Sequence, residues 1–310
     1  MWLNRTRETD HRPGTVSAAT AASTRIWRRL GAVAREALLR GLPAPELRTI
    51  LADVARVRAA ELEDADLIDR WRRDPFLTPS PIDPRASLRV QTALWECLPA
   101  EFTGVELSPL TSLGSVSRLS GIGQNRVVSA LRGGEVVFDP VHPLALEASR
   151  LRRSGHSRVH LASCVRIAQA WDSGERQRHE QRWGLISSAP DGGGFSTEAD
   201  LLNLQVDFWR DAVGAVLPGG RVEIAATDPA LAEHLAEQGT CDGVIVHPTR
   251  DAGAWRHPYV GGAFRIVTAE GDVLGDGGIV QWTQALTRNR KDRCVVSSIS
   301  VDGVVAALAH

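Results

Sequence analysis

A charged hairpin predicted between residues 159 and 187 holds the side chains best suited to binding an anion. The run Val159–Arg166 is typical of a β-strand that ends in an arginine, and Gln181–Ser187 is typical of the return strand. The loop between them contains Arg176, Arg178 and His179. Guanidinium groups bind phosphate or carboxylate through paired hydrogen bonds, so the hairpin predicts an anion site. The alternative from the same residues is an exposed hairpin whose charges only keep it soluble.

The sequence motifs of several other kinds of functional site are absent. Gly121-Ile122-Gly123 is followed by Gln-Asn-Arg rather than a third glycine, and no Walker lysine is present, which argues against a Rossmann or P-loop nucleotide site. His179-Glu180 lacks the second histidine of a zinc-protease motif. No G-x-S-x-G elbow occurs. Lys291 is the one candidate for lysine chemistry, and it lies in a polar run that indicates a solvated side chain.

The four cysteines predict neither a metal site nor a redox pair. They lie far apart and form no C-x-x-C motif, so buried, reduced thiols are expected. The residues are Cys97, Cys164, Cys241 and Cys294. We therefore assign no metal ligands from the sequence.

The elements that must position these residues belong to a chain of 310 residues with 36 basic and 37 acidic side chains. This near-neutral balance argues against a protein that binds nucleic acid over its whole surface. The N-terminus has no apolar signal segment and no apolar run approaches a membrane span, so we expect a cytoplasmic protein with no membrane partner.

The predicted organisation has four parts. Residues 1–15 form a mobile tail, and residues 16–74 form a helical hairpin with apolar stripes over Ala18–Arg40 and from Pro45 toward Trp71. Four prolines mark a linker at 75–85. Residues 86–310 alternate many short strand patterns with few helices, which predicts an α+β core with a mixed, mainly antiparallel sheet flanked by helices.

Three short patterns in this core resemble, in order, the catalytic core of class II aminoacyl-tRNA synthetases. The predicted helix Ser87–Leu98, the strand Phe102–Leu107 and Pro109 resemble motif 1, and the charged hairpin resembles motif 2. Gly275–Trp282 is similar to the Gly-Gly-Arg-Tyr-Asp segment of the histidyl-tRNA synthetase branch, and Cys294–Val305 is similar to motif 3. The likeness is greatest to histidyl-tRNA synthetase and its paralogue, the regulatory subunit of ATP phosphoribosyltransferase.

The resemblance implies functional residues and partners. Arg166 falls on the invariant motif 2 arginine, which would hold the α-phosphate of ATP, with Arg176 or Arg178 on the γ-phosphate and Mg²⁺ as the accompanying ion. The other implied ligand-binding residues are His179, Gln181, Gly277 and Gly278. Motif 1 implies a homodimer whose interface includes the helix Ser87–Leu98.

The sequence also departs from the family at positions that read the nucleotide. The acid two residues after the motif 2 arginine is Ala168, the motif 3 arginine is Gly303, and the Arg-Tyr of the glycine segment is Ile279-Val280. Charge-assisted contacts contribute about 1.5–3 kcal/mol each. The loss of two such contacts predicts that ATP binds more weakly by roughly a hundredfold or more.

Two functions follow from this combination. The first is a synthetase-like paralogue that binds an amino acid or a nucleotide-type ligand in a regulatory or accessory role and works through a partner protein. The second is an ATP-dependent ligase that forms an adenylate of an amino acid or related carboxylate for an acceptor other than full tRNA. The sequence stops at His310 with no room for an anticodon-binding domain, so tRNA is not an expected partner.

Overall fold

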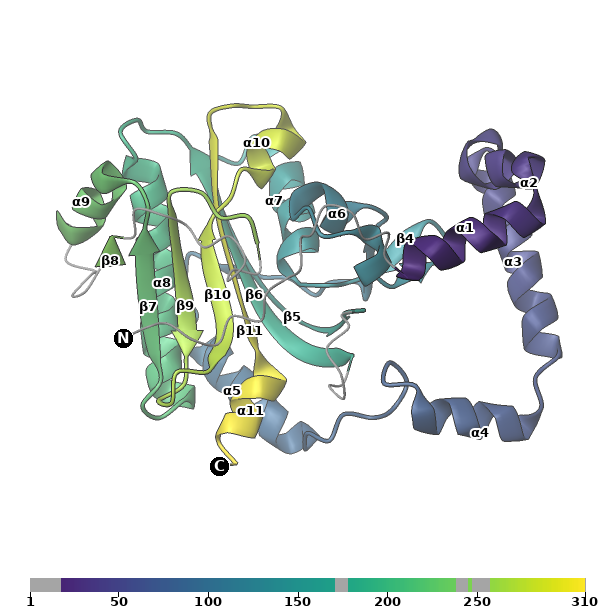
Figure 1. The fold of residues 1–310 in the computed structure, drawn as a ribbon. Helices are drawn as coiled ribbons and strands as arrows, with labels where there is room; N and C mark the ends of the chain where they lie inside the picture. The colour runs from purple at the N-terminus through teal and green to yellow at the C-terminus, as the bar shows by residue number, and fades with distance from the viewer. Residues whose placement is uncertain (1–17, 171–177, 238–244, 247–256, 310) are drawn as a thin grey trace. The chain divides into compact units, whose positions relative to one another are not determined.

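The computed structural model describes residues 18–170, 178–237, 245–246 and 257–309 (Figure 1). The chain divides into two compact units. One runs as far as Glu63 and includes Leu131–Gly133, and the other comprises Asp64–Ala130 and Gly134–His310.

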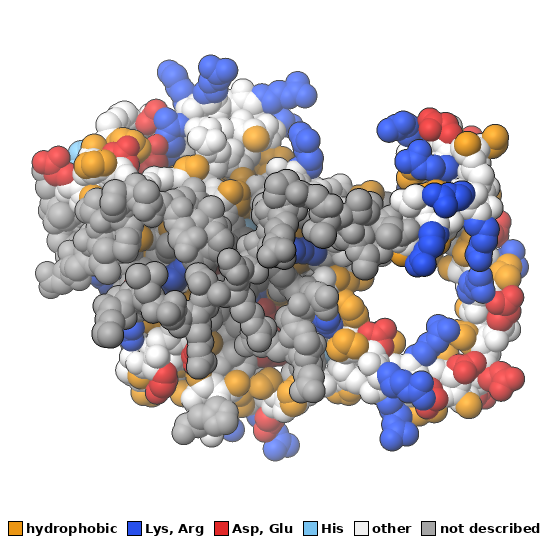
Figure 2. All heavy atoms as spheres, viewed as in Figure 1, with side chains coloured by type: hydrophobic (Ala, Val, Ile, Leu, Met, Phe, Trp, Pro, Cys, Tyr) orange, Lys and Arg blue, Asp and Glu red, His pale blue; other side chains and the backbone are white. Residues whose placement is uncertain are grey.

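The first unit is helical. It contains α1 (Ala18–Leu30), α2 (Ala32–Glu36), a π-helical turn (Ala37–Gly41) and α3 (Ala44–Ala60). The predicted helix over residues 18–40 is interrupted at Gly31, whose φ of 87° lies in the left-handed region that favours glycine. No residue of α2, the turn or α3 is buried. Figure 2 shows basic and acidic side chains together on these helices, and Arg56 pairs with Asp53 at 3.1 Å.

The second unit begins with α4 (Asp64–Arg73), so the helix predicted from Pro45 toward Trp71 is divided in two. After the proline-rich segment comes α5 (Pro84–Glu96), the helix predicted at Ser87–Leu98. The Asp83 side chain accepts a hydrogen bond from the backbone N–H of Arg85 at 2.8 Å, and Pro84 occupies the first turn, where its missing N–H costs nothing.

The core of the second unit is an eight-stranded sheet in the described part of the chain. Its spatial order is β1 (Thr103–Gly104), β5 (Val159–Ala168), β6 (His179–Pro190), β11 (Asp292–Ser300), β10 (Val273–Ile279), β9 (Gly262–Val267), β7 (Arg221–Ala226) and β8 (Ile245–Val246). The outer pairs β1–β5 and β7–β8 are parallel, and the others are antiparallel. The predicted mixed, mainly antiparallel α+β fold is confirmed. None of the described helices has the length and hydropathy needed to cross a membrane.

A small second sheet and a short helix precede the main strands. The sheet has the order β2 (Leu110–Ser112), β4 (Gly134–Val136) and β3 (Ser129–Ala130), and the helix is α6 (Ser115–Leu119). The buried carboxylate of Glu135 accepts hydrogen bonds from the backbone N–H groups of Gly114 and Val116 at 2.9 and 3.0 Å. A carboxylate at a helix start satisfies otherwise unpaired donors, so Glu135 fixes α6 to the small sheet.

The large sheet has two faces that differ in chemistry. On the α8 face, α8 (Ser196–Val216), α5 and α11 (Val301–Ala307) belong to one apolar core with sheet residues such as Trp183 and Leu185. On the α7 face, α7 (Val141–Arg153) and α10 (Trp282–Thr287) cover one end of the sheet, over residues such as Leu161 and Ile186. The helix α9 (Pro229–Glu237) packs against α8 and β7.

Candidate functional site

The register of the β5–β6 hairpin separates its charged residues onto opposite faces of the sheet. Arg166 pairs with Gln181, and Val165 pairs with Arg182. Because successive side chains of a strand point to opposite faces, Arg166 and Gln181 lie on the α8 face, whereas Arg182 lies on the α7 face. Gln181 and Arg182, although adjacent in the hairpin, therefore lie in different environments.

Arg166, the predicted anion-binding residue, contacts its own chain. Its Nη1 lies 2.8 Å from His179 Nδ1, and its Nη2 lies 3.6 Å from Asp302 Oδ2 at the start of α11. His179 Nε2 is 2.7 Å from the Thr78 carbonyl, so this nitrogen donates and Nδ1 accepts from Arg166. The Arg166 side chain remains 43% exposed. The arrangement joins the strand β5 to α11 and to the proline-rich segment.

The structure brings three predicted site residues together on this face: Arg166, His179 and Gln181. Gln181 Nε2 donates to Cys164 Sγ at 3.2 Å, and burial raises the pKa of the Cys164 thiol to about 11, so the thiol stays protonated. The backbone N–H of Arg178 donates to the Pro75 carbonyl at 3.3 Å. Arg176 lies outside the described residues.

Cys97, Cys164 and Cys294 are free thiols as expected, but only Cys294 is buried, and Cys97 and Cys164 are half-buried. Cys241 lies outside the described residues. Cys294 is fully buried, which raises its pKa to about 12. These properties make Cys294 a packing residue rather than a nucleophile.

The two predicted glycines lie on β10, which is separated from β5 by β6 and β11. A Cβ atom on Gly277 would meet Phe264 Cζ at 2.4 Å, and one on Gly278 would meet Tyr259 Cγ at 2.8 Å. Both positions therefore require glycine for packing within this chain.

The α7 face carries a buried polar cluster centred on Arg182. We define the polar cluster by seven residues: Asp139, Glu180, Arg182, Tyr259, Asp276, Ser298 and Ser300. Arg182 Nε lies 3.1 Å from Asp139 Oδ2 and 3.0 Å from Ser298 Oγ, and Nη1 donates to Glu180 Oε1 at 2.6 Å. Ser300 donates to the second oxygen of Glu180, and Tyr259 donates to Asp276 at 3.0 Å.

Electrostatics keep the Arg182 guanidinium charged although its side chain is only 1% exposed. Burial alone lowers its pKa, but the carboxylates of Glu180, Asp139 and Asp276 outweigh this effect and raise the pKa above its usual value. Among the described residues, Arg182 Nη2 has no hydrogen-bond partner. A buried guanidinium N–H without an acceptor is costly, so a ligand oxygen placed next to this atom would be stabilised.

Two buried histidines extend the polar cluster toward the small sheet. Ser120 Oγ lies 2.6 Å from His142 Nε2 and 2.9 Å from His257 Nδ1. His257 Nε2 is 3.7 Å from Asp139 Oδ2. The His142 ring stacks on Trp282 with ring centroids 5.3 Å apart. Asp139 thus lies between Arg182 and His257, although His257 Nε2 has no hydrogen-bond partner among the described residues.

Sequence reasoning did not assign functional roles to the polar cluster. One usable signal was Arg182, a charged residue at the edge of the apolar strand run Trp183–Ile186. A second was Asp139 directly before Pro140 at the start of a helix. The remaining members come from distant segments, and their proximity arises only from the order of strands in the sheet.

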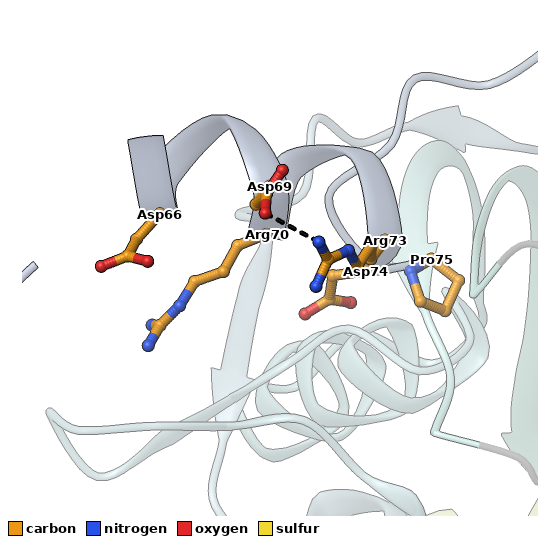
Figure 3. A pocket seen from close by; sticks show the side chains of 6 residues that line it. All are labelled: Asp66, Asp69, Arg70, Arg73, Asp74 and Pro75. Carbon is orange, nitrogen blue, oxygen red and sulfur yellow. Dashed lines mark hydrogen bonds and ion pairs between the residues drawn. The ribbon is translucent and has the colours of Figure 1, made fainter. Parts of the chain in front are cut away.

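A separate surface pocket of about 500 Å³ lies along α4 and the residues that follow it (Figure 3). It is lined by Asp66, Asp69, Arg70, Arg73, Asp74 and Pro75. Asp69 and Arg73 form an exposed ion pair at 2.7 Å, as the dashed line in Figure 3 shows. Exposed pairs of this kind contribute little energy, and the pocket offers no buried recognition group, so we place the candidate site at the polar cluster.

The architecture is that of a class II aminoacyl-tRNA synthetase-like catalytic domain. A solved ATP phosphoribosyltransferase regulatory subunit/histidyl-tRNA synthetase from Bacillus halodurans matches at TM-score 0.57 and 13% identity, over 77% of this chain and 83% of that chain. Histidyl-tRNA synthetase from S. aureus matches at TM-score 0.56 and 12% identity, over 76% and 69%. A histidine–tRNA ligase subunit from Alicyclobacillus acidocaldarius matches at TM-score 0.57 and 12% identity, over 76% and 96%.

At these identities the likeness establishes the fold. No protein-family model matches the sequence, and no curated protein matches it. The predicted resemblance to the class II core is therefore confirmed at the level of architecture, and function has to be argued from the site.

The class II fold typically binds ATP with Mg²⁺, and the described residues offer few polar groups near Arg182 on the β5 side. On the α7 face, the β5 residues opposite Arg182 and Glu180 are Val165 and Ile167, which pack with Val137 in a small apolar cluster. Within the described ranges, no group of three His, Cys, Asp or Glu side chains is placed to hold a metal ion.

Proposed function

We propose that this chain is a synthetase-like accessory protein that binds an amino acid, or a close amino-carboxylate analogue, at the polar cluster. The observation that carries the proposal is Arg182: a guanidinium 1% exposed, among carboxylates, with Nη2 lacking an acceptor in the described part of the chain. A spare cationic donor beside carboxylates complements a zwitterion, which presents one group of each charge.

The parts of the polar cluster suggest how such a ligand would be oriented. Arg182 Nη2 would donate to a ligand carboxylate oxygen. Asp276, already positioned by the Tyr259 hydroxyl at 3.0 Å, would accept from the ligand amino group. Asp276 is close enough to Arg182 to raise its pKa, so both groups belong to one electrostatic environment. The nearby His142 and Trp282 rings would adjoin a side chain of the ligand.

The charges of the polar cluster disfavour a nucleoside triphosphate as ligand, and therefore disfavour the ligase alternative. A triphosphate brings about four negative charges, which require several unengaged cationic donors. Arg182 already contacts Asp139 and Glu180, and Arg166 contacts Asp302 on the opposite face. Gly303 donates its backbone N–H to Ser300 at 2.9 Å and supplies no charge. These binding groups are consistent with a regulatory or accessory role that is exerted through a partner protein.

Thermal unfolding with each proteinogenic amino acid and with ATP–Mg²⁺ tests the proposal. We expect at least one amino acid to raise the melting temperature, because a ligand at about 100 times its Kd adds about 2.7 kcal/mol to stability. Asp276→Asn should weaken that binding about 10–100-fold, whereas Arg166→Ala, on the other face, should leave it unchanged. We expect no effect of millimolar ATP and no amino-acid-dependent exchange of pyrophosphate into ATP.

Each other outcome has a definite meaning. Pyrophosphate exchange would favour the adenylate-forming ligase. Loss of phosphate or carboxylate binding in Arg166→Ala, with Asp276→Asn unaffected, would move the site to the predicted anion position at Arg166, where Arg178, His179 and Gln181 lie nearby. Absence of any amino-acid shift would contradict the proposal.

We also propose that the chain forms a homodimer through α5 and the adjacent β1 edge. The supporting observations are Leu88 and Trp95 on α5, which are 62% and 39% exposed although large and apolar. Light scattering at tens of micromolar should give twice the chain mass, and Leu88→Glu should reduce it to one chain mass. A monomeric wild-type protein would contradict this arrangement.

A further inference from the structure

We propose that Ser120 is a nucleophile activated by His257 and Asp139, and that the chain transfers or hydrolyses the acyl group of a small ester or thioester. Ser120 Oγ lies 2.9 Å from His257 Nδ1, and the other ring nitrogen of His257 faces Asp139 Oδ2 at 3.7 Å. The order hydroxyl, imidazole, carboxylate is the one that activates a serine in acyl-transfer enzymes. This activity goes beyond ligand binding at Arg182.

The Asp139 carboxylate acts on His257 through its charge, since Oδ2 lies 3.7 Å from Nε2 and no hydrogen bond joins the two atoms. The carboxylate is fixed by Arg182 at 3.1 Å, by the Ser298 hydroxyl at 2.9 Å and by the backbone N–H of Val141 at 3.2 Å. A carboxylate accepts and cannot donate, so it favours the tautomer with the proton on Nε2. Nδ1 of His257 is then an acceptor, and the Ser120 hydroxyl donates to it.

His142 completes the arrangement from the other side. Because the Ser120 proton is directed at His257, the contact of 2.6 Å to His142 Nε2 has the imidazole as donor and the serine oxygen as acceptor. His142 is fully buried and stacked on Trp282, which restricts its ring. Ser120 Oγ is thereby held in one position with its proton already facing the base, the geometry required of an activated nucleophile.

The site also provides access and a candidate oxyanion donor. Ser120 is partly exposed, whereas His142, His257 and Asp139 are buried. It ends the helix α6 and is followed by Gly121 at φ 69°. Among the described residues, no acceptor bonds the backbone N–H of Gly121. The N–H that follows a nucleophilic serine is a common donor to the developing oxyanion.

The reaction would proceed in two balanced steps. Ser120 Oγ attacks the carbonyl carbon as its proton passes to His257 Nδ1, and the imidazolium returns that proton to the departing alcohol or thiol, which leaves an acyl-serine. Water, or an amine in a transfer reaction, then attacks the acyl carbon with His257 again as base, and the proton returns to Ser120. Asp139 stabilises the imidazolium in both steps and is not itself protonated.

Labelling with a fluorophosphonate probe, followed by peptide mass spectrometry, tests the proposal on the full chain. Ser120 Oγ displaces fluoride from phosphorus, so we expect an adduct on Ser120 in the folded protein and none on it in urea. Ser120→Ala should abolish the adduct, and His257→Gln should slow its formation about 100-fold or more. The matched control is Ser117→Ala, one helical turn earlier and outside this arrangement, which should label at the wild-type rate.

The outcomes separate this activity from amino-acid binding. No adduct on Ser120 in the folded wild-type protein would overturn the proposal, and that result needs no variant to fold. An unchanged rate in a folded His257→Gln protein, verified by circular dichroism, would also overturn it and make the histidine pair structural. The melting shifts of the preceding subsection depend on Asp276 rather than Ser120, so either proposal can fail alone.

Discussion

Replacing Arg182 with methionine is expected to lower the free energy of unfolding by about 3–5 kcal/mol, the cost of removing one partner from a buried ion pair. Methionine fills much of the same volume, so the loss comes chiefly from charge. Asp139 and Glu180 would lose the guanidinium contacts at 3.1 and 2.6 Å and remain as buried or half-buried carboxylates without that partner. Urea unfolding followed by circular dichroism measures the change.

Arg166→Met is the matched control, because it makes the same substitution one strand away on the opposite face. Arg166 is 43% exposed and its contact to Asp302 is 3.6 Å long, so the expected loss is about 0–1 kcal/mol. If the two variants were equally stable, Arg182 would not be the centre of the polar cluster. The variant Arg182→Met with Asp139→Asn should recover part of the loss, since it removes one of the orphaned charges.

The contrast between these two arginines shows what the sequence could and could not predict about the site. The strand run at 159–166, the charged loop and the return strand were predictable from alternation and turn residues, and the class II-like architecture is confirmed. The face of each side chain depends on register, and a shift of one residue exchanges the faces. A motif match to Arg166 therefore does not indicate which face of the sheet its side chain occupies. In this fold Arg182, and not Arg166, lies on the face with the polar cluster.

The polar cluster was beyond sequence reasoning for a different reason. Arg182, Ser298 and Asp276 meet because β6, β11 and β10 are neighbours in the sheet, and Asp139 joins them from the segment just before α7. Short sequence patterns do not predict that order of strands. The same limit applies to His142 and His257, whose shared contact with Ser120 joins residues 137 positions apart. Local breaks, such as Gly31 between α1 and α2, were missed because an isolated glycine is tolerated in many helices.

Gly278→Ala should lower the free energy of unfolding by about 1–3 kcal/mol, because the position has no room for a methyl group. The added Cβ would lie 2.7 Å from the Gly262 carbonyl oxygen, 2.8 Å from Tyr259 Cγ and 2.9 Å from Ala263 Cα. Two of these atoms belong to backbone, so no side-chain rotation relieves the overlap. Displacement of Tyr259 would also disturb its hydrogen bond to Asp276, and amino-acid binding should weaken together with stability.

Gly214→Ala supplies a control with the opposite expected sign. Gly214 lies in the last turn of α8, and a Cβ there meets nothing within 4 Å. Alanine costs less conformational entropy than glycine in a helix, so this variant should gain about 0.5–1 kcal/mol. Parallel urea titrations of the two variants, with melting shifts in the presence of the best amino acid, measure both effects. Equal stability of Gly278→Ala and the wild type would contradict the packing role assigned to this glycine.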